Sequence, residues 1–275
     1  MATPNSANTG PGFSRRVWNR KPRLRAAGVA LLAAVLMHGS RGLFSQAAAA
    51  AAPATNTTTF AAMAEKSYLA ARTAMKADPK AAEPAWQFAR AAFEWAEFGS
   101  NDTHRAAIAL EGIDACRQLL GRNPNLGAGH YYLALNLGRL ADTRRNLSAL
   151  RMVDEIEAEF KLALAQDPKV DFAGPDRGLG NLYLDAPGWP VSVGSKTKAR
   201  QHLRRAVELC PDFPENQLSL IEACLKWGEK KSAQPMLATF EKVLEKARSQ
   251  FTGEAWANAW QDWEHRWKKI KERLR

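Results

Sequence analysis

The stretch GHYYLALNLGRLADTRRNLSALRMVDEIEAEFKLALAQDP, residues 129–168, decides the fold. Apolar residues recur in each half at intervals of three and four, and this spacing predicts two helices that each bury one stripe. They are Tyr131, Leu133, Ala134 and Leu137, followed by Phe160, Ala163 and Leu164. Pro168 ends the second helix, because proline lacks an amide hydrogen and forces the preceding residue out of the helical region. The stretch is therefore a unit of helix, turn, helix and proline.

The same unit recurs along the 275 residues. The prolines that end it are spaced by 45, 44 and 43 residues: Pro79, Pro124, Pro168 and Pro211. A helix pair cannot cover its own apolar face, so neighbouring units must stack and share a core. This stacking predicts a curved solenoid with a concave and a convex surface.

Segments of alternating apolar and polar residues are short, so we expect a chain that is nearly all helix. The predicted helices are 57–77, 83–98, 103–121, 127–143, 146–166, 174–186, 195–209, 214–228, 231–249 and 254–274. Small residues are expected where paired helices approach most closely: Ala134, Gly180, Ala199, Ala206 and Ala233.

These units resemble the tetratricopeptide repeat (TPR). The family pattern is met by His130, Leu133, Ala134, Leu137, Phe160, Ala163 and Pro168, and again by Leu179, Gly180, Tyr183, Ala199, Leu203, Ala206 and Pro211. The next unit matches through Leu220, Ile221, Cys224 and Ala233 but lacks a closing proline. The resemblance implies an all-α, TPR-like helix-pair solenoid. Its repeats are longer than the usual 34 residues, and we expect the additional residues near 140–150 and 185–195.

The segment 173–211, with its Pro-Gly-Trp-Pro insertion at 187–190, resembles one exported branch of this family. That branch is the T component associated with tripartite ATP-independent periplasmic (TRAP) transporters. The resemblance covers about residues 80–250 and implies a periplasmic adaptor for a solute-binding protein, with a small ligand as a further implication. Members of the branch are often lipoproteins, whereas this chain has no cysteine near its expected cleavage zone.

The N-terminus has the order of a secretory signal. Residues 1–46 hold seven basic side chains and no acid, and a twelve-residue apolar run, 26–37, precedes the alanines of 47–52. The run is shorter than the roughly 20 residues that cross a bilayer. We therefore expect a signal peptide over 1–52, a solenoid over 53–250 and a capping helix over 251–275. The mature protein is then periplasmic or secreted, and the signal accounts for its contact with a membrane.

Charge and motifs limit the function classes. Outside the N-terminal segment, basic and acidic residues nearly balance, so the formal charge of +11 does not indicate a nucleic-acid surface. The sequence lacks nucleophile, phosphate-binding and metal-ligand motifs, which argues against an enzyme, a cofactor or a metal. Cys116, Cys210 and Cys224 are too scattered for a disulfide framework. They are buried thiols, or Cys210 and Cys224 form a pair.

If the first helix of each unit lines the concave surface, six polar or aromatic residues face inward beside Leu135. They are Tyr131, Arg139, Arg177, Asn181, Glu222 and Lys226. Arg177 and Asn181 are one helical turn apart, so together they suit a carboxylate. The alternative is that Arg177 pairs with a local acid such as Asp176 or Asp185.

Two aromatic features remain open. Trp189 lies in the Pro-Gly-Trp-Pro segment, where it either faces a partner or folds back onto the helix pair. The last helix carries an unbroken apolar stripe: Trp256, Trp260, Trp263, Trp267, Ile270 and Leu274. This stripe predicts a helix that caps the solenoid, or one that docks on another subunit or a membrane.

We conclude from the sequence that the protein is an exported scaffold that binds a periplasmic or envelope protein through its concave groove. The alternatives are a small-ligand-binding component, most simply for an anion, and a structural protein that forms oligomers through the tryptophan helix.

Overall fold

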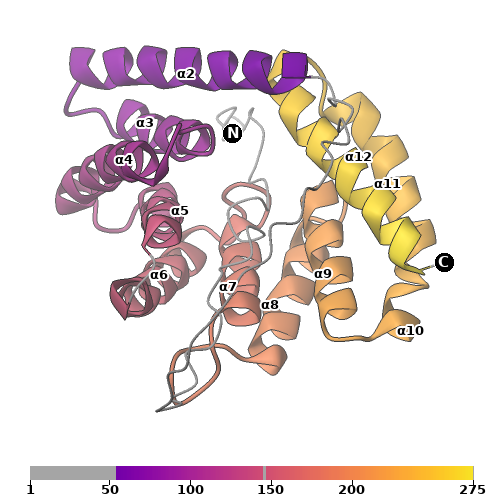
Figure 1. Cartoon of the computed structure of the whole chain (residues 1–275). Helices are drawn as coiled ribbons and strands as arrows, with labels where there is room; N and C mark the ends of the chain where they lie inside the picture. Colours follow the sequence, from indigo (N-terminus) through magenta and orange to yellow (C-terminus); the bar gives the residue numbers. More distant parts are fainter. Residues whose placement is uncertain (1–53, 145–146, 275) are drawn as a thin grey trace, which may run out of the picture.

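The computed structural model describes residues 54–144 and 147–274 (Figure 1). This part of the chain is built from helices, with an isolated β-bridge between Gly188 and Gly194. The helices are α2 (Ala54–Ala77), α3 (Ala82–Ala96), α4 (Asp102–Arg122), α5 (Gly127–Thr143), α6 (Leu147–Gln166), α7 (Gly174–Asp185), α8 (Lys196–Leu209), α9 (Pro214–Lys226), α10 (Lys230–Ala233), α11 (Met236–Gln250) and α12 (Glu254–Leu274). The all-α prediction is confirmed.

Helix ends follow the predicted ones closely, with one exception. The segment expected as a single helix over 231–249 is divided into α10 and α11 by a turn at Gln234 and Pro235. Pro235 has no amide hydrogen to donate and its ring clashes with the preceding turn, so a continuous helix cannot run through it. Pro235 therefore divides the segment into two helices.

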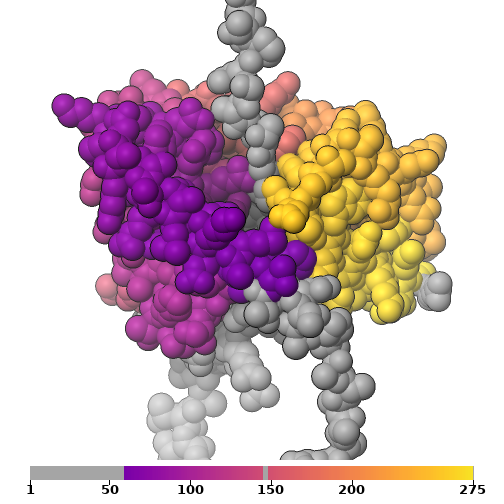
Figure 2. Space-filling view, turned by 90° about the horizontal axis from the view of Figure 1, so that it is seen from above, coloured from indigo at the N-terminus to yellow at the C-terminus, as the bar shows by residue number. Residues whose placement is uncertain are grey.

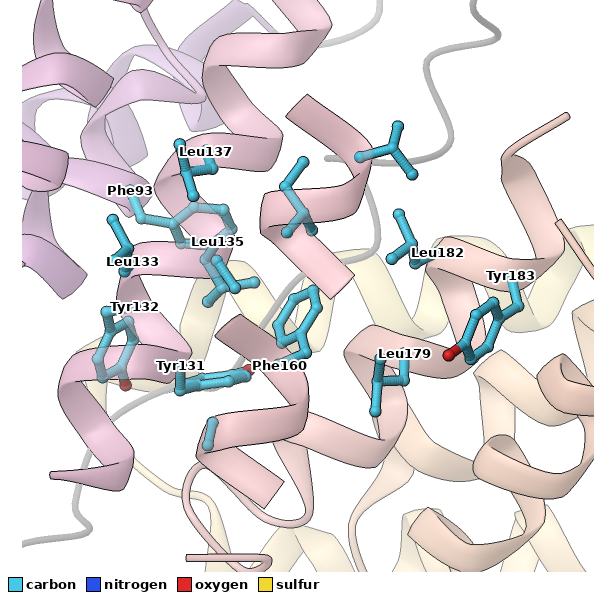
Figure 3. Packing of buried hydrophobic residues seen from close by; sticks show 14 of the residues in the cluster. Phe93, Tyr131, Tyr132, Leu133, Leu135, Leu137, Phe160, Leu179, Leu182 and Tyr183 are labelled. Atoms are coloured by element: carbon cyan, nitrogen blue, oxygen red, sulfur yellow. The ribbon is translucent and has the colours of Figure 1, made fainter. Parts of the chain in front are cut away.

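Consecutive helices pair as α3 with α4, α5 with α6 and α7 with α8, and the pairs stack into a solenoid (Figure 1). Tyr131 and Phe160 lie with ring centroids 6.0 Å apart, and Leu179 of α7 joins the same cluster (Figure 3). Gly180 allows α7 to approach α8 closely, because a Cβ there would lie 2.6 Å from Cγ of Leu203. Gly180 thus lies where α7 and α8 approach closely, as expected, and Ala134, Ala199, Ala206 and Ala233 are all completely buried.

The additional length of the repeats has two different forms. In the first long unit, residues 140–143 belong to α5 and 147–150 to α6, so longer helices take up most of the segment where we expected extra residues. In the second, residues 186–195 form a true loop between α7 and α8. The predicted insertion is therefore confirmed as a loop at 186–195 only.

The two terminal helices turn the solenoid into a partly closed body. Trp256, Trp263 and Trp267 of α12 are buried in a cluster with side chains of α9 and α11, so α12 covers the end of the stack. Helix α2 crosses the other end, and its N-terminal part reaches α12 (Figures 1 and 2). Cys116, Cys210 and Cys224 are free thiols, so Cys210 and Cys224 are not joined.

Candidate binding pocket on the concave face

Tyr131 and Arg177, two of the residues expected to face an open groove, lie inside the protein. Arg177 is completely buried and donates to Oδ2 of Asp171 at 2.7 Å and to Oδ1 of Asn216 at 2.8 Å. The hydroxyl of Tyr131 donates to the same Asp171 oxygen at 2.6 Å. Burial, and then the charge of Asp171, raises the pKa of Tyr131 well above its usual value. The expectation that these two side chains project into the groove is wrong, because they join one repeat to the next.

The acid that pairs with Arg177 is neither Asp176 nor Asp185. It is Asp171, in a turn where Asp171, Phe172 and Ala173 all have positive φ angles, of 49°, 55° and 63°. Such left-handed residues cost about 1–3 kcal/mol each and persist only where the surroundings hold them. Arg177 supplies that support by donating to the carbonyls of Asp171 and Phe172, both at 3.0 Å.

Asn181 and Arg139 are also buried, with different surroundings. Asn181 has no exposed surface, and neither its amide nitrogen nor its amide oxygen has a hydrogen-bond partner in the described residues. Arg139 forms an ion pair of 2.8 Å with Glu97, and its guanidinium lies 4.8 Å from the ring centre of Phe93. Asn181 is therefore not on an open surface, whereas Arg139 contributes to the pocket described below.

The other predicted residues lie elsewhere. Glu222 forms an ion pair of 3.0 Å with Arg266 of α12, so it helps to hold the capping helix. Lys226 donates to the carbonyl of Leu184 at 3.1 Å. Trp189 is 89% exposed at the tip of the 186–195 loop, so it does not fold back onto the helix pair. A role in partner binding stays a prediction for all seven residues.

A pocket of about 160 Å³ occupies the concave face where α2, α3, α5 and α12 converge. Its apolar wall includes Phe60 and Met63 of α2, Phe93 of α3 and Leu135 of α5. The polar lining is Ser67, Arg90, Glu94, Glu97, Arg139, Asp171, Glu254 and Asn258. Since α2 and α12 come from opposite ends of the described chain, the pocket forms only when both terminal helices are in place (Figure 2).

The charges of the pocket are arranged in pairs. Arg90 contacts Glu94 at 2.9 Å, and Asp171 has the Arg177 contact described above. Burial raises the pKa of Glu94, although the adjacent Arg90 opposes this shift. Among the described residues, Glu254 has no such basic partner, and it is exposed. Every acidic side chain of the lining except Glu254 has an arginine partner, so the lining carries one unbalanced negative charge.

Three buried polar atoms of the lining lack hydrogen bonds among the described residues, and one of them, Nη1 of Arg139, has the ion pair with Glu97 instead. Oδ1 of Asn258 is buried and has no donor, and Nε of Arg139 has no acceptor, in the part of the chain that the structure describes. Buried polar atoms without partners are uncommon in folded proteins, and a bound guest is one way to satisfy them. The site thus combines an aromatic and aliphatic wall with unused hydrogen-bonding capacity, as ligand pockets do.

The fold has a known counterpart. The chain is similar to a thermophilic TPR protein in Thermus thermophilus, with a TM-score of 0.57 over 78% of this chain and 95% of that chain. The chain has a TPR-like fold. Sequence identity is 19%, so the likeness concerns the fold alone. No protein-family model matches the sequence, and no curated protein does.

Sequence reasoning missed most of the pocket of this TPR-like chain. Phe60, Met63 and Asn258 belong to the terminal helices, and the repeat pattern does not say where those helices lie. Asp171 stands just past a proline in a turn without glycine, where left-handed residues are not expected. Within the described residues, no group of three or more histidine, cysteine or acidic side chains is placed to hold a metal ion. None of the helices described is both long and apolar enough to span a bilayer.

Proposed function

We propose that this chain is a non-catalytic interaction protein whose concave pocket receives one side chain of a protein partner. The observation that carries the proposal is the pocket itself, which both terminal helices close over the inner surface of a TPR-like solenoid. Its volume of about 160 Å³ is close to that of cavities that hold a benzene-sized molecule. The site therefore suits a single anchoring side chain better than a long peptide.

The chemistry of the lining favours a basic anchor. Glu254 has no ion-pair partner among the described residues, and Oδ1 of Asn258 has no donor, while Phe60 and Met63 offer apolar surface. A lysine or arginine side chain would lay its methylene stem along the apolar wall and place its charge beside Glu254. The anionic guest expected from the sequence depended on Arg177, whose charge Asp171 already balances.

A photo-crosslinking amino acid at Met63 tests this proposal. We expect it to label a partner that the same group at Leu162, which is 43% exposed on α6 away from the pocket, does not label. With the purified partner, Glu254→Lys should weaken binding about tenfold or more, since it reverses the charge beside the anchor. Equal labelling from both positions, or unchanged affinity in the Glu254 variant, would refute the proposal.

The small volume of the pocket also favours a second candidate, a small-ligand-binding component. A small organic amine would satisfy Asn258 and Glu254 as a lysine side chain does. Thermal unfolding in a panel of organic amines and organic acids separates the candidates. A rise in the melting temperature that Asn258→Leu abolishes would support the ligand, whereas no shift with any compound would leave the protein anchor.

We further propose that the chain is exported and that its partner is a periplasmic or envelope protein, such as the solute-binding protein of a TRAP-type transporter. The support is the signal-like pattern of 1–52, outside the described residues, and the resemblance of 173–211. N-terminal sequencing of the protein from a periplasmic extract should find a start within 47–53. Retention of the whole protein in the cytoplasm would contradict export.

The oligomer hypothesis receives less support. It needed a tryptophan stripe open to another subunit, but Trp256, Trp263 and Trp267 are buried against the protein's own helices.

A further inference from the structure

The edge of the solenoid that carries Trp189 is basic. We define the basic rim as residues 186–198, 226–231 and 268–273. It includes the loop between α7 and α8, the turn from α9 into α10, and the last turns of α12. These segments contain nine lysines and arginines, all exposed, and two acids. Two of the lysines are paired, Lys196 with Glu229 and Lys226 with the adjoining Asp185, which leaves most of the basic side chains in excess. The balance is unlike that of the whole described chain, where acids and bases are close in number.

Three contacts place these segments at one edge. Arg273 of α12 donates to the carbonyl of Leu225 at 3.4 Å, and the next residue, Lys226, reaches the end of α7 at Leu184. Lys196 at the start of α8 forms an ion pair of 2.7 Å with Glu229. Figure 1 shows the loop before α8 and the helix α10 at the same lower edge.

Apolar side chains protrude from this charged edge. Trp189 is 89% exposed and Val191 is 62% exposed. They are the two most exposed large apolar side chains in the described part of the chain, and they lie two residues apart in one loop. The rim therefore combines a hydrophobic tip with a surrounding field of positive charge.

Backbone hydrogen bonds hold the loop of residues 186–195 at the point where it joins α7 and α8. The amide of Gly194 donates to the carbonyl of Pro187 at 2.9 Å, and the amide of Ser195 donates to the carbonyl of Tyr183 at 2.9 Å. A Cβ at Gly194 would lie 2.1 Å from the carbonyl oxygen of Ala186, so only glycine fits there. Val193 packs against the core. The contacts at Gly194 and Ser195 thus hold the loop with Trp189 already exposed, so Trp189 can contact a partner without a rearrangement of the loop.

We propose that the basic rim docks on a bilayer of anionic phospholipids, with Trp189 and Val191 inserted at the level of the headgroups. Tryptophan prefers this interface because one side of its ring system is apolar and the indole N–H remains hydrated. The surrounding lysines are attracted to the negative surface potential. A nucleic acid would use the charges but leave the apolar tip without a role, so the bilayer accounts for both features.

Vesicle flotation tests this proposal with the protein as isolated from cells. The vesicles contain phosphatidylglycerol and phosphatidylcholine in equal parts, and the comparison uses phosphatidylcholine alone. We expect binding to the anionic vesicles that falls as salt is added, because salt screens the attraction. Trp189→Ala should weaken partition roughly tenfold, since part of a large aromatic surface then no longer leaves water.

Charge variants separate the rim from overall charge. Lys230→Glu with Lys231→Glu should weaken partition by about fivefold or more for each position, the factor expected for one basic residue at such a surface. Lys76→Glu with Lys80→Glu is the matched control, because it changes the net charge equally at the opposite edge and should leave partition nearly unchanged. All four lysines are exposed, so folding is not at issue.

Three results would overturn the proposal. They are equal binding to neutral and anionic vesicles, equal loss in the rim and control variants, and unchanged partition of the Trp189 variant. Tight binding to duplex DNA without vesicle binding would assign the rim to nucleic acid instead. Direct evidence of insertion comes from tryptophan fluorescence. A bromine-labelled lipid should quench the fluorescence of the wild type more than that of Trp189→Ala.

Discussion

Nη1 of Arg266 on α12 donates hydrogen bonds to both carboxylate oxygens of Glu215 at the start of α9, at 2.9 and 2.8 Å. Glu215 is completely buried, and the indole of Trp263 donates to it at 3.1 Å. Arg266 also contacts Asp262 and Glu222, both at 3.0 Å. The capping helix is therefore attached by a buried charge cluster as well as by its tryptophans.

Arg266→Met should destabilise the protein by about 3–5 kcal/mol, because it leaves Glu215 charged and buried without its main partner. Urea denaturation followed by circular dichroism measures the loss. Arg248→Met on α11 removes an exposed ion pair with Glu264 of α12 and a guanidinium contact of 5.0 Å with the Trp260 ring. Because both interactions are at the surface, it should cost about 1 kcal/mol, well below the loss in Arg266→Met. Equal losses in the two variants would mean that α12 is held by its apolar stripe alone.

The loss in Arg266→Met should depend on pH. Burial raises the pKa of Glu215 even with Arg266 present, and removing the arginine raises it further. A carboxyl group whose folded pKa is raised favours folding below its unfolded pKa and loses that contribution as pH rises through the folded pKa. The variant should therefore lie closer to wild type in acid than at neutral pH. Adding Glu215→Gln should remove this pH dependence.

Arg177→Met should also destabilise the fold strongly, by about 3–5 kcal/mol, because Asp171 and Asn216 lose a buried partner. The prediction distinguishes a structural Arg177 from the ligand-binding role considered from the sequence. Arg204→Met is the control, since Arg204 is exposed on α8 and should change stability by less than about 0.5 kcal/mol. If Arg177→Met folds with wild-type stability and loses only a binding activity, our assignment fails.

Two glycines of α4 offer a test of helix packing. A Cβ on Gly112 would lie 2.5 Å from Oδ1 of Asn136 on α5, whereas a Cβ on Gly121 meets nothing within 4 Å. Gly112→Ala should therefore destabilise by about 1–3 kcal/mol through overpacking. Gly121→Ala should stabilise by up to about 1 kcal/mol, because alanine favours the helix. Thermal unfolding of both variants measures the contrast, and the same sign of change in both would contradict it.

The sequence was sufficient for the helices because each unit repeats one apolar stripe and one proline, and both signals are local. It was not sufficient for Arg177, although the partner Asp171 is only six residues away. Their contact depends on a left-handed turn of three non-glycine residues, which tertiary contacts stabilise and local propensity does not indicate.

The candidate pocket was beyond sequence reasoning for a different reason. Phe60 and Asn258 line the same pocket only because α2 and α12 both fold over the concave face. A repeat pattern specifies how neighbouring units stack, whereas the terminal helices are constrained by shape and by single contacts. The sequence thus predicts a concave surface formed by stacked helix pairs, but it does not predict that α2 and α12 fold over that surface.

Helix α2 is held partly by one hydrogen bond, in which the hydroxyl of Tyr68 donates to Glu111 at 2.8 Å. Burial and this bond raise the pKa of Tyr68 from 10.0 to about 12. Because the folded pKa is the higher one, the stabilisation is complete below pH 10 and is lost as pH rises towards 12. Tyr68→Phe should cost about 1 kcal/mol at neutral pH and should lack this alkaline loss.

The measurement for α2 is the free energy of urea unfolding at pH values on either side of the ordinary tyrosine pKa, for wild type and for Tyr68→Phe. Arg72→Met serves as the comparison, because Arg72 contacts the same Glu111 at 3.2 Å but both side chains are 40% exposed. That exposed pair should contribute less than about 1 kcal/mol at neutral pH. Because the charge of Arg72 opposes the rise in the Tyr68 pKa, the contribution of Arg72 should grow as the tyrosine ionises, opposite to the loss expected for the hydroxyl. A difference between wild type and Tyr68→Phe that stays constant through alkaline pH would show that the tyrosine hydroxyl does not attach α2. The wall of the pocket that α2 supplies would then depend on its apolar contacts alone.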